Sequence, residues 1–162
     1  MEDFKYWMLK YQESHQNKTN IAIHFLCVPL IFISLFYLIY AIPFPEFSVG
    51  NFNIQKSAYL NWGILIYYFL LIFWFRLKFK IGFLFLVLGL ILTYSSVFIY
   101  EFLFSGFAKV PVLIFSSIFI ISWIGQFYGH KIEGKKPSFI DDLKFLLIGP
   151  IWVVYKILGK TP

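Results

Sequence analysis

Four long stretches without a charged side chain constrain what this sequence can fold into. Residues 19–45, 57–75, 81–100 and 110–130 contain no Asp, Glu, Lys or Arg, and they are 27, 19, 20 and 21 residues long. A helix needs roughly 20 mostly apolar residues to cross a bilayer. A buried helix of a soluble protein explains one such stretch, but four in 162 residues indicate a membrane protein. We therefore expect an all-α integral membrane protein with four transmembrane helices, at about 21–42, 58–75, 81–100 and 110–128.

The basic residues are distributed unevenly around these stretches. Four crossings place the N-terminus, the central turn RLKFK (Arg76 to Lys80) and the C-terminus on one side, and twelve of the 14 Lys and Arg lie in those segments. The two loops on the other side carry only Lys56 and Lys109. Because Lys and Arg accumulate in cytoplasmic loops, both termini are expected to be cytoplasmic. The orientation of the protein in the membrane then explains its net charge of +6, and no nucleic-acid partner is predicted.

Two further helices are predicted outside the four spans. Residues 3–16 place apolar side chains at helical spacing on one face, as in an amphipathic helix that lies in the headgroup zone. Near the C-terminus, SFID predicts a capping box, with Ser138 as N-cap and Asp141 at the third helical position. The uncharged run that follows, 145–155, has only 11 residues and contains Pro150, which predicts an interrupted interfacial or re-entrant helix. The whole chain, 1–162, is expected to form a single membrane domain.

This arrangement brings all three histidines to one membrane face. His15 precedes the first span, His24 lies about one turn inside it, and His130 leaves the fourth span on the same side. His15 and His24 are nine residues apart, so on one unbroken helix they would point to opposite sides. The polar segment HQNKTN (His15 to Asn20) breaks the helical pattern and lets the chain turn, and Asn20 is the predicted N-cap of the first span.

Polar residues accompany the histidines at helical spacing. These partners lie four residues before a histidine or three residues after one: Tyr11, Asn20, Gln126 and Glu133. Imidazole and carboxylate groups are common ligands of transition metals, and two or three His with one carboxylate suit non-haem Fe(II) and oxygen chemistry. Zinc accepts the same donors, so the pattern alone leaves both metals open. We predict a metal site at His15, His24 and His130.

The other polar residues are expected to support this site. Asn20, Gln126 and Tyr11 are placed to orient the imidazole rings by hydrogen bonding, as the outer partners of metal ligands usually do. Polar side chains at membrane depth are costly, which favours a functional role for His24 with Asn20 in particular.

Two motifs resemble a known family. The N-terminal motif, YQESHQNKTNIAIHFLCVP, contains Tyr11, His15, Asn20, His24 and Pro29. The C-terminal motif, QFYGHKIEGKKP, contains Gln126, Gly129, His130, Glu133 and Pro137. Together they resemble the membrane 2-hydroxy fatty acid dioxygenases known from the breakdown of phytosphingosine to odd-numbered fatty acids, over nearly the whole chain. The sequence departs from that pattern at Cys27, where Gly is usual, at Ser138, where Ala is common, and at Lys156, where an acidic residue is frequent.

The resemblance implies an enzyme. A member would use Fe(II) and O2 to convert a 2-hydroxy long-chain fatty acid into a fatty acid one carbon shorter (α-oxidation), without a separate reductant or 2-oxoglutarate. By the same resemblance, His15, His24 and His130 are the expected iron ligands, and Glu133 is a fourth ligand or a nearby base. The site would lie at the cytoplasmic face of the lipid bilayer, in a bacterial inner membrane or, in a eukaryote, in the endoplasmic reticulum.

Two other functions are compatible with the residues alone. A metal-free membrane protein, such as a small transporter subunit or an assembly factor, would contain no stoichiometric metal. A haem protein with two histidine ligands would show a Soret band.

Overall fold

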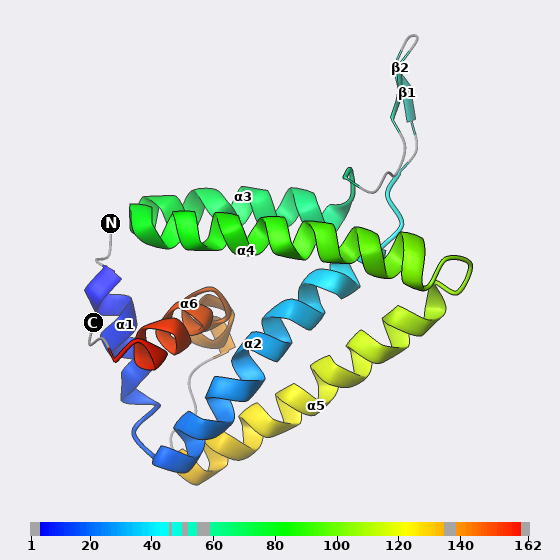
Figure 1. Ribbon diagram of the computed structural model, residues 1–162. Coiled ribbons are helices and arrows are strands. Elements are labelled where there is room, and N and C mark those ends of the chain that lie inside the picture. Colours follow the sequence, from blue (N-terminus) through cyan, green and yellow to red (C-terminus); the bar gives the residue numbers. More distant parts are fainter. Residues whose placement is uncertain (1–3, 46, 50–51, 55–58, 135–138, 160–162) are drawn as a thin grey trace. The chain divides into compact units, whose positions relative to one another are not determined.

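The computed structural model describes residues 4–45, 47–49, 52–54, 59–134 and 139–159 (Figure 1). Its helices are α1 (Phe4–Glu13), α2 (Lys18–Ala41), α3 (Trp62–Leu77), α4 (Phe79–Val97), α5 (Lys109–Glu133) and α6 (Phe139–Ile157), and a π-helical segment, η1 (Phe98–Leu103), continues α4. An antiparallel hairpin, β1 (Phe47–Val49) and β2 (Phe52–Ile54), follows α2. The predicted helical class is confirmed, and the hairpin adds two short strands where only a loop was expected.

Three of the described helical segments are long and apolar enough to cross a membrane: Lys18–Ala41, Phe79–Leu103 and Lys109–Glu133. Helix α3 is also apolar but has only 16 residues. It begins at Trp62 rather than at Ala58, because the Asn61 side chain caps it by accepting a hydrogen bond from the Ile64 N–H at 3.1 Å. The long helices are those of a membrane protein, and a fourth crossing through α3 stays a prediction.

The chain divides into two compact units. The first contains Met1–Phe32 and Ile118–Pro162, and the second contains Ile33–Ser117. The boundary therefore falls inside α2 and inside α5. All three histidines belong to the first unit.

In the second unit, α3 and α4 run side by side as a helical hairpin (Figure 1). Their connection is Lys78 alone, whose extended backbone (φ −165, ψ 128) both ends α3 and starts α4. The Tyr67 hydroxyl donates to the Phe85 carbonyl at 2.6 Å, and a Cβ at Gly89 would overlap the Tyr67 ring. Gly89 thus lets α4 approach Tyr67 of α3 closely.

In the first unit, α1 packs against α6. The ring centroids of Phe4 and Tyr155 are 5.3 Å apart, and those of Tyr11 and Phe145 are 4.9 Å apart. Met8 and Tyr11 are therefore buried within the unit, whereas the sequence predicted that this face of α1 lies in the headgroup zone.

Helix α6 runs through Pro150, so the predicted interruption is wrong. Buried side chains on both sides of the proline, Ile148 and Trp152, hold the helix in place. Ser138 and the side chain of Asp141, the predicted capping box, lie outside what the structure describes.

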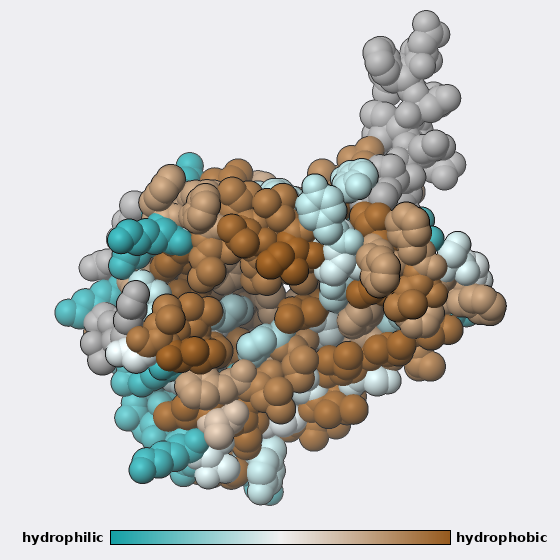
Figure 2. Space-filling view, in the orientation of Figure 1, coloured by the Kyte–Doolittle hydropathy of each residue, from teal (hydrophilic) through white to brown (hydrophobic). Residues whose placement is uncertain are grey.

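Hydrophobic residues cover much of the surface over α5, while hydrophilic residues gather around the connection between α1 and α2 (Figure 2). On α5, Ile120, Ile121 and Ile124 are more than half exposed. A soluble protein rarely exposes such a continuous apolar face. A helix that contacts lipid along its length explains it.

Candidate metal centre

His15 lies in the connection that follows α1. Its Nδ1 is 2.6 Å from the Tyr11 carbonyl, and the Tyr11 ring stacks on it with centroids 4.1 Å apart and planes at 6°. Because a carbonyl can only accept, Nδ1 carries the proton and Nε2 presents a lone pair. The side chain is 2% exposed.

Burial also keeps this ring neutral. Loss of hydration of the charged form lowers the pKa of His15 from 6.5 to about 4, and the hydrogen bond to the Tyr11 carbonyl only partly opposes that shift. At neutral pH the imidazole is therefore uncharged, which is the form that binds metal ions.

His24 lies one turn into α2, and a main-chain carbonyl fixes its tautomer in the same way. Its Nδ1 is 2.9 Å from the Asn20 carbonyl, so the proton is again on Nδ1 and the lone pair on Nε2. The side chain is 1% exposed. Two buried histidines from one continuous segment thus each present an Nε2 acceptor.

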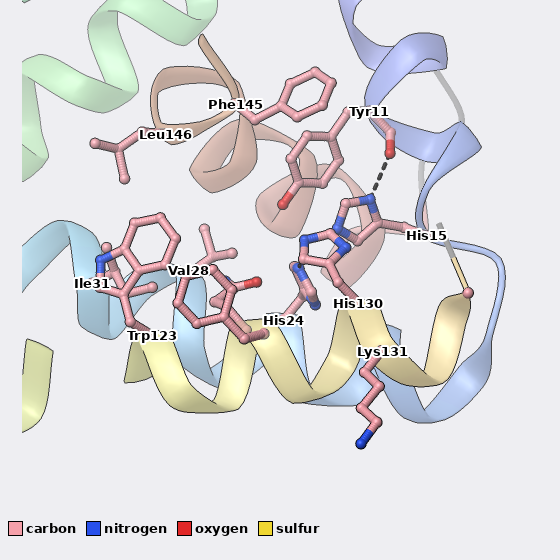
Figure 3. A pocket seen from close by; sticks show the side chains of 13 residues that line it. Tyr11, His15, His24, Val28, Ile31, Trp123, His130, Lys131, Phe145 and Leu146 are labelled. Atoms are coloured by element: carbon pink, nitrogen blue, oxygen red, sulfur yellow. Dashed lines mark hydrogen bonds between the residues drawn. The ribbon is translucent and has the colours of Figure 1, made fainter. Parts of the chain in front are cut away.

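His130, in the last turns of α5, completes the cluster. Its Nε2 is 3.3 Å from the Nε2 of His24, and one nitrogen from each of the three rings lies within 4.8 Å of the others. Figure 3 shows the three rings turned toward one another at one end of a cavity.

This geometry fits a metal ion. In a tetrahedral zinc site, for example, two nitrogens bound at about 2.0–2.1 Å are roughly 3.4 Å apart. The His24–His130 separation is already close to that value. Within the described part of the chain, His15 Nε2 is buried and has no hydrogen-bond partner, which is costly unless something outside the chain uses its lone pair.

The start of α2 differs from the prediction. Asn17, and not Asn20, caps the helix, because its Oδ1 accepts from the Thr19 N–H at 2.8 Å. Asn20 lies inside the first turn and is completely buried. Its amide nitrogen donates to the Ser14 carbonyl at 3.1 Å and to Glu133 Oε2 at 3.0 Å.

Glu133 lies at the end of α5, and its carboxylate binds the α1–α2 connection. Oε1 accepts from the Gln16 N–H at 2.8 Å, and Oε2 accepts from the Asn17 N–H at 2.9 Å as well as from Asn20. The carboxylate oxygens are not in the cluster of possible ligand atoms formed by the three histidines.

A cavity of about 540 Å³ adjoins the histidines (Figure 3). Tyr11 and Gln126, both predicted site residues, line it together with all three histidines. The rest of its wall is mainly apolar and includes Val28, Ile31, Trp123, Phe145 and Leu146. Lys131 also borders the cavity, but its side chain points away from the histidines (Figure 3). A polar end with metal-ligand chemistry therefore opens into an apolar compartment.

For three residues that contribute to the site, no role there was predicted from the sequence. Gly129 has no room for a side chain, because a Cβ there would overlap Asn20 Oδ1 and lie 3.3 Å from the His24 ring. Trp152 of α6 is fully buried with its ring centroid 5.2 Å from that of His15. Asn17 is the third. Gly129 belongs to the C-terminal motif and Asn17 to the polar segment HQNKTN, whereas no pattern in the sequence indicates Trp152.

Comparisons with known proteins place these residues in a family. No curated protein and no solved structure matches the chain. The family described as 2-hydroxy-palmitic acid dioxygenase Mpo1-like matches residues 1–161, which includes both histidine motifs. The chain therefore belongs to the 2-hydroxy-palmitic acid dioxygenase Mpo1-like family.

Proposed function

We propose that this chain is an Fe(II)-dependent membrane dioxygenase that converts a 2-hydroxy long-chain fatty acid and O2 into a fatty acid one carbon shorter. The observation that carries the proposal is the convergence of three histidine nitrogens at the polar end of an apolar cavity. The family description supports the substrate class.

The overall reaction balances without a further reductant. The 2-hydroxy acid R–CH(OH)–COOH and O2 give R–COOH, CO2 and H2O. The C1–C2 bond breaks, C1 leaves as CO2, and C2 becomes the new carboxyl carbon. The substrate gives up four electrons, and O2 takes up four. Bound iron would supply the activation of O2 that this chemistry needs.

The chain's own residues have distinct roles in this proposal. His15, His24 and His130 would hold the metal through one ring nitrogen each, and the carbonyls of Tyr11 and Asn20 keep the first two rings in the tautomer that leaves Nε2 available. Tyr11 and Gln126 present polar side chains to the cavity, where they can hydrogen-bond the substrate head.

The apolar wall of the cavity suits the acyl chain of the substrate. Val28, Ile31 and Leu146 surround the space beyond the histidines and can take the acyl chain out of water. Hydrophilic residues gather around the α1–α2 connection, which carries His15, and this supports a substrate head near the membrane surface (Figure 2). We assign this surface to the cytoplasmic face, in a bacterial inner membrane or in the endoplasmic reticulum of a eukaryote.

Metal content tests the proposal directly. Protein purified without oxygen should contain about one iron per chain by plasma mass spectrometry, because three histidine nitrogens converge, and His24→Ala should lose it. The iron-loaded protein should convert 2-hydroxypalmitate and O2 into a fifteen-carbon acid and CO2, and the variant should not.

A matched control and two opposing results complete the experiment. Ser117→Ala removes an exposed hydroxyl that bonds the Leu113 carbonyl of its own helix, and it should keep both iron and turnover. Folded wild-type protein without metal would overturn the proposal in favour of a metal-free membrane protein. Stoichiometric zinc, or a Soret band from haem, would overturn the iron assignment.

A further inference from the structure

Glu133 forms three hydrogen bonds with a segment more than 110 residues away in the sequence. Its carboxylate oxygens accept from the Gln16 N–H, the Asn17 N–H and the Asn20 side-chain amide at 2.8, 2.9 and 3.0 Å. We call these three hydrogen bonds the Glu133 clamp. Hydrogen bonds to an ionised acceptor are about twice as strong as neutral ones.

The donors of the clamp suit a carboxylate. Gln16 and Asn17 lie just before α2, where backbone N–H groups have no acceptor within the helix. The N-terminus of a helix also carries a partial positive charge, which favours a negative group beside it. One side chain of α5 therefore satisfies two main-chain donors and complements the start of α2.

The clamp connects the two segments that carry the histidines. His130 lies three residues before Glu133 on α5, His15 directly precedes Gln16, and His24 follows Asn20 by one turn. We propose that Glu133 is a positioning residue that holds the end of α5 against the α1–α2 connection, so that three histidine nitrogens meet, and that it is not a metal ligand. This inference rests on the metal site of the proposed function.

The contacts of the carboxylate favour positioning over ligation. Each oxygen already accepts at least one short hydrogen bond from the α1–α2 segment. Among the described groups that could jointly hold a metal, the cluster contains His15, His24 and His130 without Glu133. Gly129 lets α5 lie against Asn20, which places Glu133 within reach of its donors.

Co(II) is a suitable probe, because its visible absorption bands report coordination directly. In Glu133→Gln, one side-chain oxygen is replaced by an NH2 group that cannot accept. We expect the Kd for Co(II) to rise about 10-fold or more, as for other groups that orient metal ligands. The spectrum of the saturated variant should match that of the wild type. Glu13→Gln, which removes an exposed carboxylate of α1, is the charge-matched control and should shift Kd less than about twofold.

Two results would contradict the proposal in this titration. A changed spectrum at saturation would make Glu133 a ligand. An unchanged Kd in a folded variant would show that the clamp does not position the histidines.

Hydrogen exchange on the wild type provides a test that needs neither metal nor a folded variant. The amides of Gln16 and Asn17 lie outside any helix, yet they should exchange slowly because Glu133 accepts from both. Fast exchange would overturn the clamp. If these amides are protected but the wild type binds no Co(II), the clamp stands and the proposed metal site fails.

Discussion

At His15 and His24, a main-chain carbonyl decides which ring nitrogen carries the proton. The Tyr11 and Asn20 carbonyls each accept from the Nδ1 of the histidine four residues later. Substituting the Tyr11 or Asn20 side chain removes neither carbonyl. The tautomer should therefore survive changes that alter the surroundings of the rings.

Tyr11 has two proposed roles, since its ring stacks on His15 and its hydroxyl contacts the substrate, and two substitutions separate these roles. Tyr11→Phe keeps the ring that stacks on His15 and the carbonyl that accepts from it, so Co(II) affinity should stay within about twofold of the wild type. The lost hydroxyl faces the cavity, and kcat/KM for 2-hydroxypalmitate should fall about 10-fold or more, the cost of a hydrogen bond to a charged head. Tyr11→Ala also removes the stacked ring and should weaken Co(II) binding about 10-fold.

These two variants are measured by Co(II) titration and by steady-state turnover. Equal metal affinity in Tyr11→Ala and Tyr11→Phe would show that the stacked ring does not support His15. Full turnover by Tyr11→Phe would remove the hydroxyl from the proposed substrate contacts.

The sequence predicts which residues form the site better than it predicts the atoms through which they interact. Charge-free windows and helical spacing predict that the three histidines meet, because helix ends on one side of a bilayer are neighbours. The same spacing pairs Tyr11 with His15 and Asn20 with His24. It does not show that main-chain carbonyls make these contacts, since every residue has one. The partners of Glu133 depend on how α5 lies against α2, which no local pattern encodes.

At the scale of the elements, α2 and α5 approach each other through small residues in the first unit. A Cβ at Gly125 would lie 2.7 Å from Cys27 Sγ, and the next described atom, Ile23 Cγ2, is 3.8 Å away. One sulfur atom is therefore what excludes a side chain from this position.

This contact predicts that the effect of Gly125→Ala on stability depends on whether residue 27 is Cys or Ala. Gly125→Ala in the wild type should lower stability by about 1–3 kcal/mol, because an extra methyl group overpacks the contact. In a Cys27→Ala background the sulfur is gone, and the same substitution should be neutral or stabilise by up to about 1 kcal/mol through helix propensity. Thermal unfolding of the wild type, the two single variants and the double variant in detergent, followed by circular dichroism, measures both effects. Equal losses in the two backgrounds would mean that Cys27 is not the obstacle.

Element boundaries show where sequence prediction fails at this scale. The sequence predicts α2 and α4 to within three residues, because polar residues and prolines bound the first and charged residues bound the second. It misplaces the start of α3, since the Asn61 cap is one polar residue inside an uncharged run. It also predicts an interruption at Pro150, where burial of the neighbouring side chains holds α6 together.

At the scale of the whole molecule, the number of crossings decides which loops share a side. The 16 residues of α3 span about 24 Å, whereas the apolar core of a bilayer is about 30 Å thick. A short span is tolerated when the bilayer thins or flanking residues reach the interface. If α3 crosses, the α3–α4 turn lies on the same side as α1. If it does not, that turn lies on the opposite side.

The single cysteine makes this measurable. In a Cys27→Ala background, single new cysteines replace three exposed residues: Lys5 in α1, Lys80 in the first turn of α4 next to the α3–α4 connection, and Phe107 before α5. Intact cells then receive a membrane-impermeant maleimide. Four crossings with cytoplasmic termini predict labelling at 107 alone, with 5 and 80 labelled only after permeabilisation. Three crossings with the same N-terminus predict labelling at 80 and none at 107. The reverse of the four-span pattern, with 5 and 80 labelled in intact cells, would keep four crossings but put the histidines on the outer face.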